Sequence, residues 1–379
     1  MLFPFQIISS GMQKFLTNQL PDRTVVLEDG KKYLWFSGTD YLGMGHNEEF
    51  RTYLNEGFSR FGTHFGSSRN NSLQLPIFSQ TEEKLAAFFH APDAITVSSG
   101  MWAGQLLMKE IENIVKRNSC SDKIQFHYAP GVHPALWGNH YVTQNDPWNK
   151  WAVATVGMVT DSPQNLSHII CTDSVGSPRV EEYDFSIFKN LPAGREVWLI
   201  VDDSHGIGVT GESGNGIFEM ATSLENDKVI VTASLNKAMG IPAGIILAEK
   251  EVTEQLRASP WFSGASPFAP AYSFALNLLL TNGIYQQTYE ELKENIRYFK
   301  NHLNGLKLIT AIDDYPVFCS ENPALFQYLL DKGIMASCFP YPLSTDLPTT
   351  RLAITARHKK EDLNRLAEVC KQFEIANPS

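Results

Sequence analysis

Two stretches decide the fold: Val197-Trp-Leu-Ile-Val-Asp-Asp-Ser-His205 and Val229-Ile-Val-Thr-Ala-Ser-Leu-Asn-Lys237. Each begins with an apolar, β-branched run that is long enough for one buried strand, and each ends in polar residues. Ligands of an open α/β sheet bind at the carboxyl ends of its strands, so the two polar clusters predict one shared site. The first cluster offers the carboxylate of Asp202 and the imidazole of His205, and the second offers the hydroxyl of Ser234 and the amine of Lys237.

Similar apolar runs recur through the first two thirds of the chain and alternate with helical or loop segments. Because these runs are continuous, they predict a mostly parallel sheet that is covered on both faces. A capping box at Ser79–Glu82 predicts that a helix starts there. The expected strands are Ala94–Val97, Ile124–Tyr128, His168–Thr172, Val197–Asp202, Val229–Ala233 and Gly244–Ala248.

The pattern changes after about residue 258. A Pro- and Ser-rich stretch leads into a long helical pattern from Ala271 to about Leu306, followed by short strands near 311–319 and 350–355. A final helix is expected from Lys360 to about Phe373. We therefore expect an N-terminal arm over residues 1–45, a large α/β domain over 46–258 and a smaller α+β domain over 259–379.

Composition limits the classes of function. The 379 residues are 43% hydrophobic and 19% charged, which is typical of a globular protein, and the net charge of -10 argues against binding to nucleic acid or anionic membranes. No apolar run approaches the roughly 18 residues of a membrane helix, and the N-terminus lacks the basic region of a signal peptide, so we expect a cytoplasmic protein. The cysteines have no metal-type spacing and predict reduced thiols and no metal site; they are Cys120, Cys171, Cys319, Cys338 and Cys370.

The polar groups at the strand ends fit one cofactor. Pyridoxal phosphate requires an amine for a Schiff base, a carboxylate for its pyridinium nitrogen and an anion site for its phosphate. Ser98–Ala103 follows an expected strand and precedes a helical pattern, so its backbone N–H groups either bind an anion or form a simple N-cap. His133 follows the strand that ends near Tyr128, where its ring either stacks on a bound aromatic cofactor or, as for most lone histidines, has no such role.

Two further patterns leave alternatives open. Arg351 lies in an expected strand, where it either faces inward and grips a carboxylate or faces solvent. Gly206–Gly211 formally matches the dinucleotide fingerprint GxGxxG. Four polar residues separate these glycines from the preceding strand and no strong helix former follows, so the pattern disfavours a nicotinamide site.

Several motifs together resemble the α-oxoamine synthases, a family of fold-type I pyridoxal-phosphate enzymes. The resemblance runs from about Gly30 to the C-terminal helix, and the second aspartate motif with its spacing to the lysine is highly specific. The motifs that carry it are Phe36–Gly43, Ser67–Asn70, Ser99–Met101, Val201–Glu212, Ser234–Gly240 and Arg351–His358.

The resemblance implies a role for each matching residue. Lys237 would form the Schiff base and transfer the proton, Asp202 would pair with the pyridine nitrogen, and His205 would bond the phenolic oxygen O3′. His133 would stack on the ring, and Arg351 would bind the amino-acid carboxylate. The phosphate would be held by Gly100, Met101 and Ser234, and Ser177 would contact the cofactor or the substrate. The family's homodimer further implies that contacts near Ser263–Ser266 reach the partner's cofactor.

The chain departs from the family's pattern at four places. Thr39 stands where the family has asparagine, and Thr349 replaces the first arginine of a pair whose second member is Arg351. Gly66–Pro76 has fewer glycines than usual, and Asp173–Ser177 replaces a glutamate-containing segment. These departures predict intact cofactor chemistry and an altered pocket for the acyl donor.

The resemblance implies a decarboxylative condensation of an amino acid with an acyl thioester of coenzyme A or an acyl carrier protein. The leading pair is L-alanine with a pimeloyl thioester, as in biotin synthesis. One alternative is glycine or serine with another acyl donor. Another is a catalytically silent cofactor-binding protein, which the presence of Lys237, Asp202 and His205 disfavours.

Overall fold

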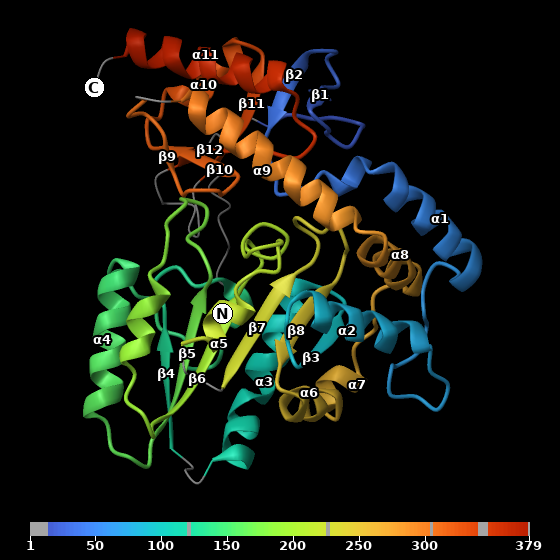
Figure 1. The fold of residues 1–379 in the computed structure, drawn as a ribbon, viewed down its shortest axis with the longest axis vertical. Coiled ribbons are helices and arrows are strands. Elements are labelled where there is room, and N and C mark those ends of the chain that lie inside the picture. The colour runs from blue at the N-terminus through green and yellow to red at the C-terminus, as the bar shows by residue number, and fades with distance from the viewer. Residues whose placement is uncertain (1–13, 120–122, 225–227, 304–305, 340–347, 378–379) are drawn as a thin grey trace, which may run out of the picture.

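The computed structural model describes residues 14–119, 123–224, 228–303, 306–339 and 348–377 (Figure 1). Its larger lobe is built on a six-stranded sheet in the order β3-β8-β7-β6-β5-β4. The expected strand ends agree with the observed ones to within one residue. The bounds are β3 Asp93–Val97, β4 Ile124–Tyr128, β5 Ser167–Asp173, β6 Glu196–Asp202, β7 Val229–Ser234 and β8 Gly244–Ala248.

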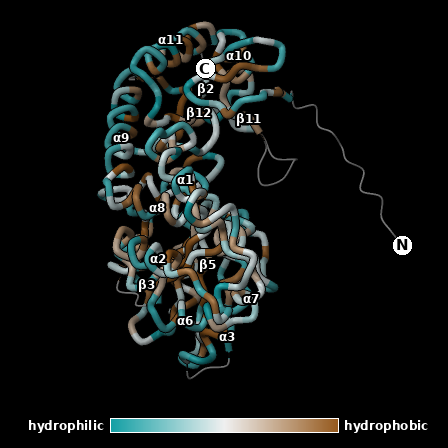
Figure 2. The backbone as a smooth tube through the Cα atoms, turned by 90° about the vertical axis from the view of Figure 1, so that its right-hand side faces the viewer, coloured by the Kyte–Doolittle hydropathy of each residue, from teal (hydrophilic) through white to brown (hydrophobic). Residues whose placement is uncertain are grey.

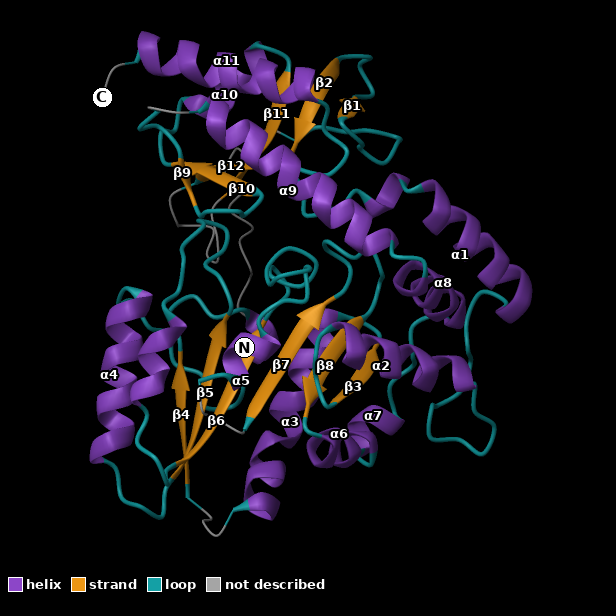
Figure 3. Cartoon of the chain, viewed as in Figure 1, coloured by secondary structure: helices purple, strands orange, loops and turns teal. Residues whose placement is uncertain are grey.

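This sheet is mostly parallel, as the sequence predicts. Strands β4 to β7 pair in parallel, while β8 is antiparallel to both of its neighbours, β3 and β7. Ile169, Ile170 and Cys171 are consecutive in β5, so they face alternate sides of the sheet, and all three are fully buried. Helices therefore cover both faces, which explains why the apolar runs are continuous (Figure 3).

A second six-stranded sheet forms the smaller lobe, in the order β1-β2-β11-β12-β10-β9. Its N-terminal strands pair with strands from the other end of the chain: β2 runs parallel to β11, with Phe36 opposite Ala336 (Figure 1). Part of the expected N-terminal arm thus belongs to the C-terminal sheet, and the predicted domain bounds stay a prediction. The bounds are β1 Thr24–Val26, β2 Lys32–Phe36, β9 Thr310–Ala311, β10 Val317–Ser320, β11 Ile334–Phe339 and β12 Thr349–Ala353.

The helices surround both sheets, and α8 and α9 lead from the larger lobe into the smaller one (Figure 2). One continuous apolar core includes both Ile200 of β6 and Phe318 of β10. No helix in the described part of the chain is long and apolar enough to cross a membrane. The bounds are α1 Glu48–Phe61, α2 Pro76–Phe88, α3 Gly100–Asn118, α4 Trp148–Asp161, α5 Phe218–Thr222, α6 Lys250–Arg257, α7 Pro260–Ser263, α8 Pro270–Thr281, α9 Ile284–His302, α10 Leu325–Asp331 and α11 Lys360–Ala376.

Two helix predictions were wrong. The capping box at Ser79–Glu82 does not start a helix: α2 begins at Pro76, and the Ser79 hydroxyl donates to the Pro76 carbonyl from inside the first turns. Proline is favoured at a first helical position because it has no N–H to satisfy. The helical pattern from Ala271 to Leu306 is two helices, because Gly283 adopts a φ of 70° and turns the chain between them.

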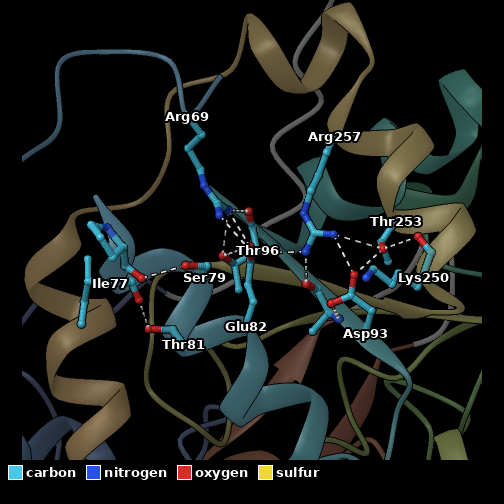
Figure 4. A network of polar contacts seen from close by, with 12 residues as sticks. Arg69, Ile77, Ser79, Thr81, Glu82, Asp93, Thr96, Lys250, Thr253 and Arg257 are labelled. Carbon is cyan, nitrogen blue, oxygen red and sulfur yellow. Dashed lines mark hydrogen bonds and ion pairs between the residues drawn. The ribbon is translucent and has the colours of Figure 1, made fainter. Parts of the chain in front are cut away.

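The glutamate of that false capping box has a structural role instead (Figure 4). The buried carboxylate of Glu82 accepts bonds from Arg69, from the backbone N–H and hydroxyl of Thr96 in β3, and from Arg257 at the end of α6. Arg257 also bonds Asp93 at 2.7 Å. Glu82 therefore fastens the loop before α2 to the edge of the large sheet.

Candidate active site

The polar strand ends meet at a cavity of about 210 Å³. It lies where the ends of β5, β6 and β7 approach the smaller lobe, the edge at which an open α/β sheet binds its ligands. Six of the predicted site residues line it, together with five others. The lining residues are Thr39, His133, Asp173, Val175, Ser177, Pro178, Asp202, His205, Lys237, Phe339 and Arg351.

The amine of Lys237 lies in a charged but largely buried environment. Burial lowers the pKa of Lys237 below its ordinary value, and Arg351 acts in the same direction, while Asp202 and Asp173 oppose the shift. A lowered pKa raises the fraction of neutral amine, which is the form that attacks a carbonyl carbon. Lys237 is thus prepared for nucleophilic chemistry by its surroundings.

Asp202 ends β6, is 5% exposed, and accepts a bond of 2.9 Å from the backbone N–H of Ser204. Nδ1 of His133 lies 3.7 Å from the Asp202 carboxylate but accepts a bond of 3.1 Å from the Ala135 N–H. That nitrogen therefore carries no proton, so the contact is not an ion pair. Burial also lowers the pKa of His133, which favours the same neutral ring.

His205 is a second imidazole at the cavity wall. Burial, reinforced by the positive charges of Lys237 and Arg351, lowers the pKa of His205 well below its ordinary value. Its Nδ1 is buried and has no hydrogen-bond partner among the described residues. A buried polar atom without a partner is costly, and a ligand hydroxyl at this wall would find an unpaired imidazole there.

Arg351 reaches the cavity from β12 of the smaller lobe. Its side chain is 5% exposed, which rules out the solvent-facing alternative. The guanidinium donates to the carbonyl of Gly38 at 3.2 Å and to the hydroxyl of Tyr41, and it lies 5.8 Å from the centroid of the Tyr41 ring. No carboxylate of the described residues pairs with it, so this buried cation can accept a carboxylate ligand.

The expected anion site lies beside the cavity rather than in its lining. Ser99 caps α3 by accepting a bond of 3.1 Å from the Trp102 N–H, and Gly100 opens the helix. A Cβ atom on Gly100 would lie 2.4 Å from Cβ of Ser234, so the helix start abuts the end of β7. Gly100 and Ser234 are thus brought together, and Met101 next to them is 48% exposed.

The two consecutive aspartates have different environments. Asp203 is fully buried beneath the glycine-rich loop, residues 206–216. Its carboxylate accepts a bond of 2.9 Å from the Ile217 N–H, and its backbone carbonyl accepts a bond from the Gly206 N–H. Burial raises the pKa of Asp203 to about 7. A Cβ atom on Gly206 or on Gly216 would lie about 2 Å from this carboxylate. The glycines therefore fold around an acid rather than open a phosphate-binding helix, which argues against a dinucleotide site.

Sequence reasoning missed several lining residues. Asp173 was noted only as a departure from the family's pattern, yet it is the register partner of Asp202 and accepts a bond of 3.1 Å from the His133 N–H. Burial and the charge of Asp202 raise the pKa of Asp173 well above its ordinary value. The position of Asp173 at the end of an expected strand was the signal from which it could have been predicted as a site residue. Val175 and Phe339 carry no chemical signature.

No group of histidine, cysteine or acidic side chains within the described ranges could hold a metal ion. The cysteines that the structure describes, Cys171, Cys319, Cys338 and Cys370, are free, and Cys120 lies outside the described residues.

Comparisons with known proteins cover almost the whole chain. The sequence profile of the aminotransferase class I and II family matches residues 31–369. The 8-amino-7-oxononanoate synthase of Thermosipho melanesiensis is 26% identical, with 95% of this chain and 93% of that protein covered. The enzyme of the same name from Citrobacter koseri is 25% identical, with coverages of 94% and 93%.

Two solved structures share the fold. Serine palmitoyltransferase of Sphingomonas wittichii superposes with a TM-score of 0.79 at 16% identity, covering 96% of this chain and 92% of that one. The 8-amino-7-oxononanoate synthase of Francisella tularensis gives a TM-score of 0.66 at 20% identity, with coverages of 91% and 98%.

Proposed function

Because this chain belongs to the aminotransferase class I and II family, we propose that it is a pyridoxal-phosphate enzyme that joins an amino acid to an acyl thioester with loss of carbon dioxide. One observation carries this proposal. Lys237 and Asp202 from the larger lobe share a cavity with the buried Arg351 from the smaller lobe, which no carboxylate of the described residues pairs with. An amine, an acid and an anion site in one cavity match the cofactor and an amino acid together.

The residues present fit the cofactor. Nδ1 of His205 has no hydrogen-bond partner among the described residues, and the side chain of Ser234 abuts Gly100 at the start of α3, so its hydroxyl lies beside a helix N-terminus, where an anion binds favourably. Lys237 would hold the aldehyde carbon, Asp202 the pyridine nitrogen and His205 the phenolic oxygen, with His133 against the ring. The phosphate would lie against Gly100, Met101 and Ser234, and Ser177 would touch the cofactor or the substrate. When bound, pyridoxal phosphate supplies an electron sink for negative charge at the substrate α-carbon.

The protein's own groups would do the remaining work. Arg351 would hold the amino-acid carboxylate, and its bonds to Gly38 and Tyr41 keep the guanidinium oriented before the substrate arrives. The neutral amine of Lys237 would remove the α-proton, because burial lowers the pKa of Lys237 toward the working pH. The α-carbon would then attack the thioester carbonyl with loss of the thiol, the carboxyl group would depart as carbon dioxide, and the protonated amine of Lys237 would return a proton to the α-carbon.

For the substrates we favour L-alanine and a pimeloyl thioester, because relatives at 25–26% identity over most of the chain are named 8-amino-7-oxononanoate synthase. The donor would be carried by coenzyme A or an acyl carrier protein. We further propose a cytoplasmic homodimer. The free cysteines of the described residues support the cytoplasm, and the homodimer rests on the resemblance to the α-oxoamine synthases.

The test combines absorption spectroscopy with turnover. Purified protein loaded with pyridoxal phosphate is titrated with L-alanine, glycine or L-serine, and product formation is then followed with pimeloyl-, acetyl- or palmitoyl-coenzyme A. We expect an amino-acid-dependent spectral change and turnover with one pair. Lys237→Ala should abolish both, whereas Lys189→Ala, at an exposed position, should change neither. A cofactor-loaded protein whose spectrum no amino acid changes would instead be a silent binding protein.

A further inference from the structure

Asp173 is an acidic residue of the cavity lining to which the proposed chemistry gives no role. It ends β5 as the register partner of Asp202, which ends β6, and both side chains line the cavity. Residues at the same level of two paired strands point to the same face of a sheet, so the two acids are neighbours. The Ser174 N–H donates at 2.9 Å to the backbone carbonyl of Asp202, which fixes the two strand ends relative to each other.

The Asp173 carboxyl group also contacts His133, which follows β4. Its Oδ1 accepts a hydrogen bond of 3.1 Å from the backbone N–H of His133. The His133 ring is held separately, because its Nδ1 accepts a bond of 3.1 Å from the Ala135 N–H in the 3-10 helix η2, Pro134–Leu136. Asp173 therefore fixes the backbone from which this imidazole projects, and Ala135 fixes the orientation of the ring.

The charge of Asp173 is disfavoured by its surroundings. Burial and the charge of Asp202 raise the pKa of Asp173 well above its ordinary value, while the His133 N–H and the charge of Lys237 act in the opposite direction. Tyr183 also faces Asp173, and burial raises the pKa of this phenol, which stays uncharged. An uncharged carboxyl group still accepts a hydrogen bond through its carbonyl oxygen, so the bond to His133 does not require a negative charge.

We propose that Asp173 is a positioning residue: as an uncharged group it fixes His133 against the face of the cofactor ring, and it leaves Asp202 as the negative charge at the pyridine nitrogen. This inference rests on the proposed function, because it requires pyridoxal phosphate in the cavity. Asp173 itself would not touch the reacting atoms, since it acts on the cofactor through the imidazole of His133.

Two variants separate the hydrogen bond from the charge. Asp173→Asn keeps a carbonyl oxygen that can accept the His133 N–H but cannot be charged, and Asp173→Leu has neither an acceptor nor a charge. The matched control is Asp184→Leu, because Asp184 is exposed, accepts the Ser186 N–H at 3.1 Å and does not line the cavity. Each protein is loaded with pyridoxal phosphate. Circular dichroism in the absorption band of the cofactor reports the orientation of its ring, and equilibrium dialysis gives its dissociation constant.

We expect Asp173→Asn and Asp184→Leu to match the wild type in dichroism and in affinity for the cofactor. Asp173→Leu should change the dichroic band and weaken cofactor binding by about two- to tenfold, the factor that one hydrogen bond typically contributes. A change in Asp173→Asn as large as that in Asp173→Leu would show that the charge is needed. An unchanged Asp173→Leu would show that the bond does not act on the cofactor. Either result overturns the inference.

A double-mutant cycle tests whether Asp173 acts through the imidazole. His133→Ala removes the ring that Asp173 positions, so adding Asp173→Leu to it should change neither the dichroism nor the affinity further. An equal effect of Asp173→Leu with and without the His133 ring would overturn the inference. Urea unfolding of the cofactor-free proteins shows which variants fold. Asp173→Ala, which removes the acceptor without adding a larger apolar side chain, replaces Asp173→Leu if that variant does not fold.

The inference and the proposed function fail in different ways. If the wild-type protein binds the cofactor and the variants show the expected pattern, but no amino acid is condensed with any acyl thioester, the proposed function is wrong and the role of Asp173 stands. If turnover occurs while Asp173→Asn and Asp173→Leu behave alike, the proposed function stands and the role of Asp173 is wrong. A protein that binds no pyridoxal phosphate overturns both.

Discussion

Replacing Arg351 with methionine should weaken amino-acid binding strongly without lowering protein stability. The guanidinium is 5% exposed, and its bonds to Gly38 and Tyr41 leave donors free for a ligand. Truncating one partner of a buried, hydrogen-bonded charge pair costs about 2–4 kcal/mol, which corresponds to about a 30- to 1,000-fold loss of affinity.

The same change should act differently on the free protein. Without substrate, Arg351 is a buried cation with no carboxylate partner among the described residues, and burying an unpaired charge is unfavourable. Methionine keeps the aliphatic bulk and removes that charge. We therefore expect the free energy of unfolding to be unchanged or raised in Arg351→Met.

Both quantities can be measured on one preparation. The affinity comes from the cofactor absorbance during titration with the amino acid, and the free energy of unfolding comes from urea denaturation without it. The control is Arg365→Met, an exposed arginine of α11, which should leave affinity unchanged. Unchanged affinity in Arg351→Met, or affinity and stability falling together, would refute a role in binding the substrate carboxylate.

Three further changes test other parts of the site and fold. Asp202→Asn should keep the cofactor but slow the exchange of the substrate α-proton with solvent. This exchange is measured by proton NMR in heavy water, and a near-normal rate would exclude Asp202 as the partner of the pyridine nitrogen. Gly100→Ala should lower the free energy of unfolding by about 1–3 kcal/mol and weaken cofactor retention on dialysis, because its Cβ would lie 2.4 Å from Ser234. Gly157→Ala, which meets no atom within 4 Å, should not destabilise the protein. Finally, the free energy of unfolding should fall by up to about 3 kcal/mol as the pH is lowered from about 6.5 to about 4. Burial lowers the pKa of His127 to about 4, so the unfolded chain binds the proton first, and His127→Gln should flatten this dependence in urea titrations.

The larger sheet was predictable because its strands are local signals. A continuous apolar run such as the one ending at Asp202 reports burial on both faces without knowledge of its neighbours. The wrong helix start at Ser79 shows the limit of such local patterns. A capping box involves only neighbouring residues, whereas the Glu82 carboxylate accepts hydrogen bonds from β3 and α6, which are distant in sequence. The break at Gly283 was also missed, since a glycine inside a helical pattern is compatible with continuing the helix.

The site was predictable to the extent that parallel strands share an edge. That rule brought Asp202 and Lys237 together from sequence alone, and it would have included Asp173 had it been applied to β5. The inward orientation of Arg351 depends on the register of β12 in a sheet that residues 24–36 help to build, and no local pattern encodes that pairing. Val175 and Phe339 shape the cavity only through their position.

The parallel pairing of β2 with β11 has a consequence for synthesis on the ribosome. About 300 residues separate Phe36 from its partner Ala336. At a synthesis rate of about 5–20 residues per second, β11 is made about 15–60 seconds after β2. Throughout that interval β1 and β2 form a bare hairpin, which is at best marginally stable. The larger lobe can form while this hairpin waits, but the smaller one cannot. The nascent chain therefore acquires Lys237 and Asp202 early and Arg351 last, so a ribosome-bound chain should hold the cofactor before it can hold the amino acid.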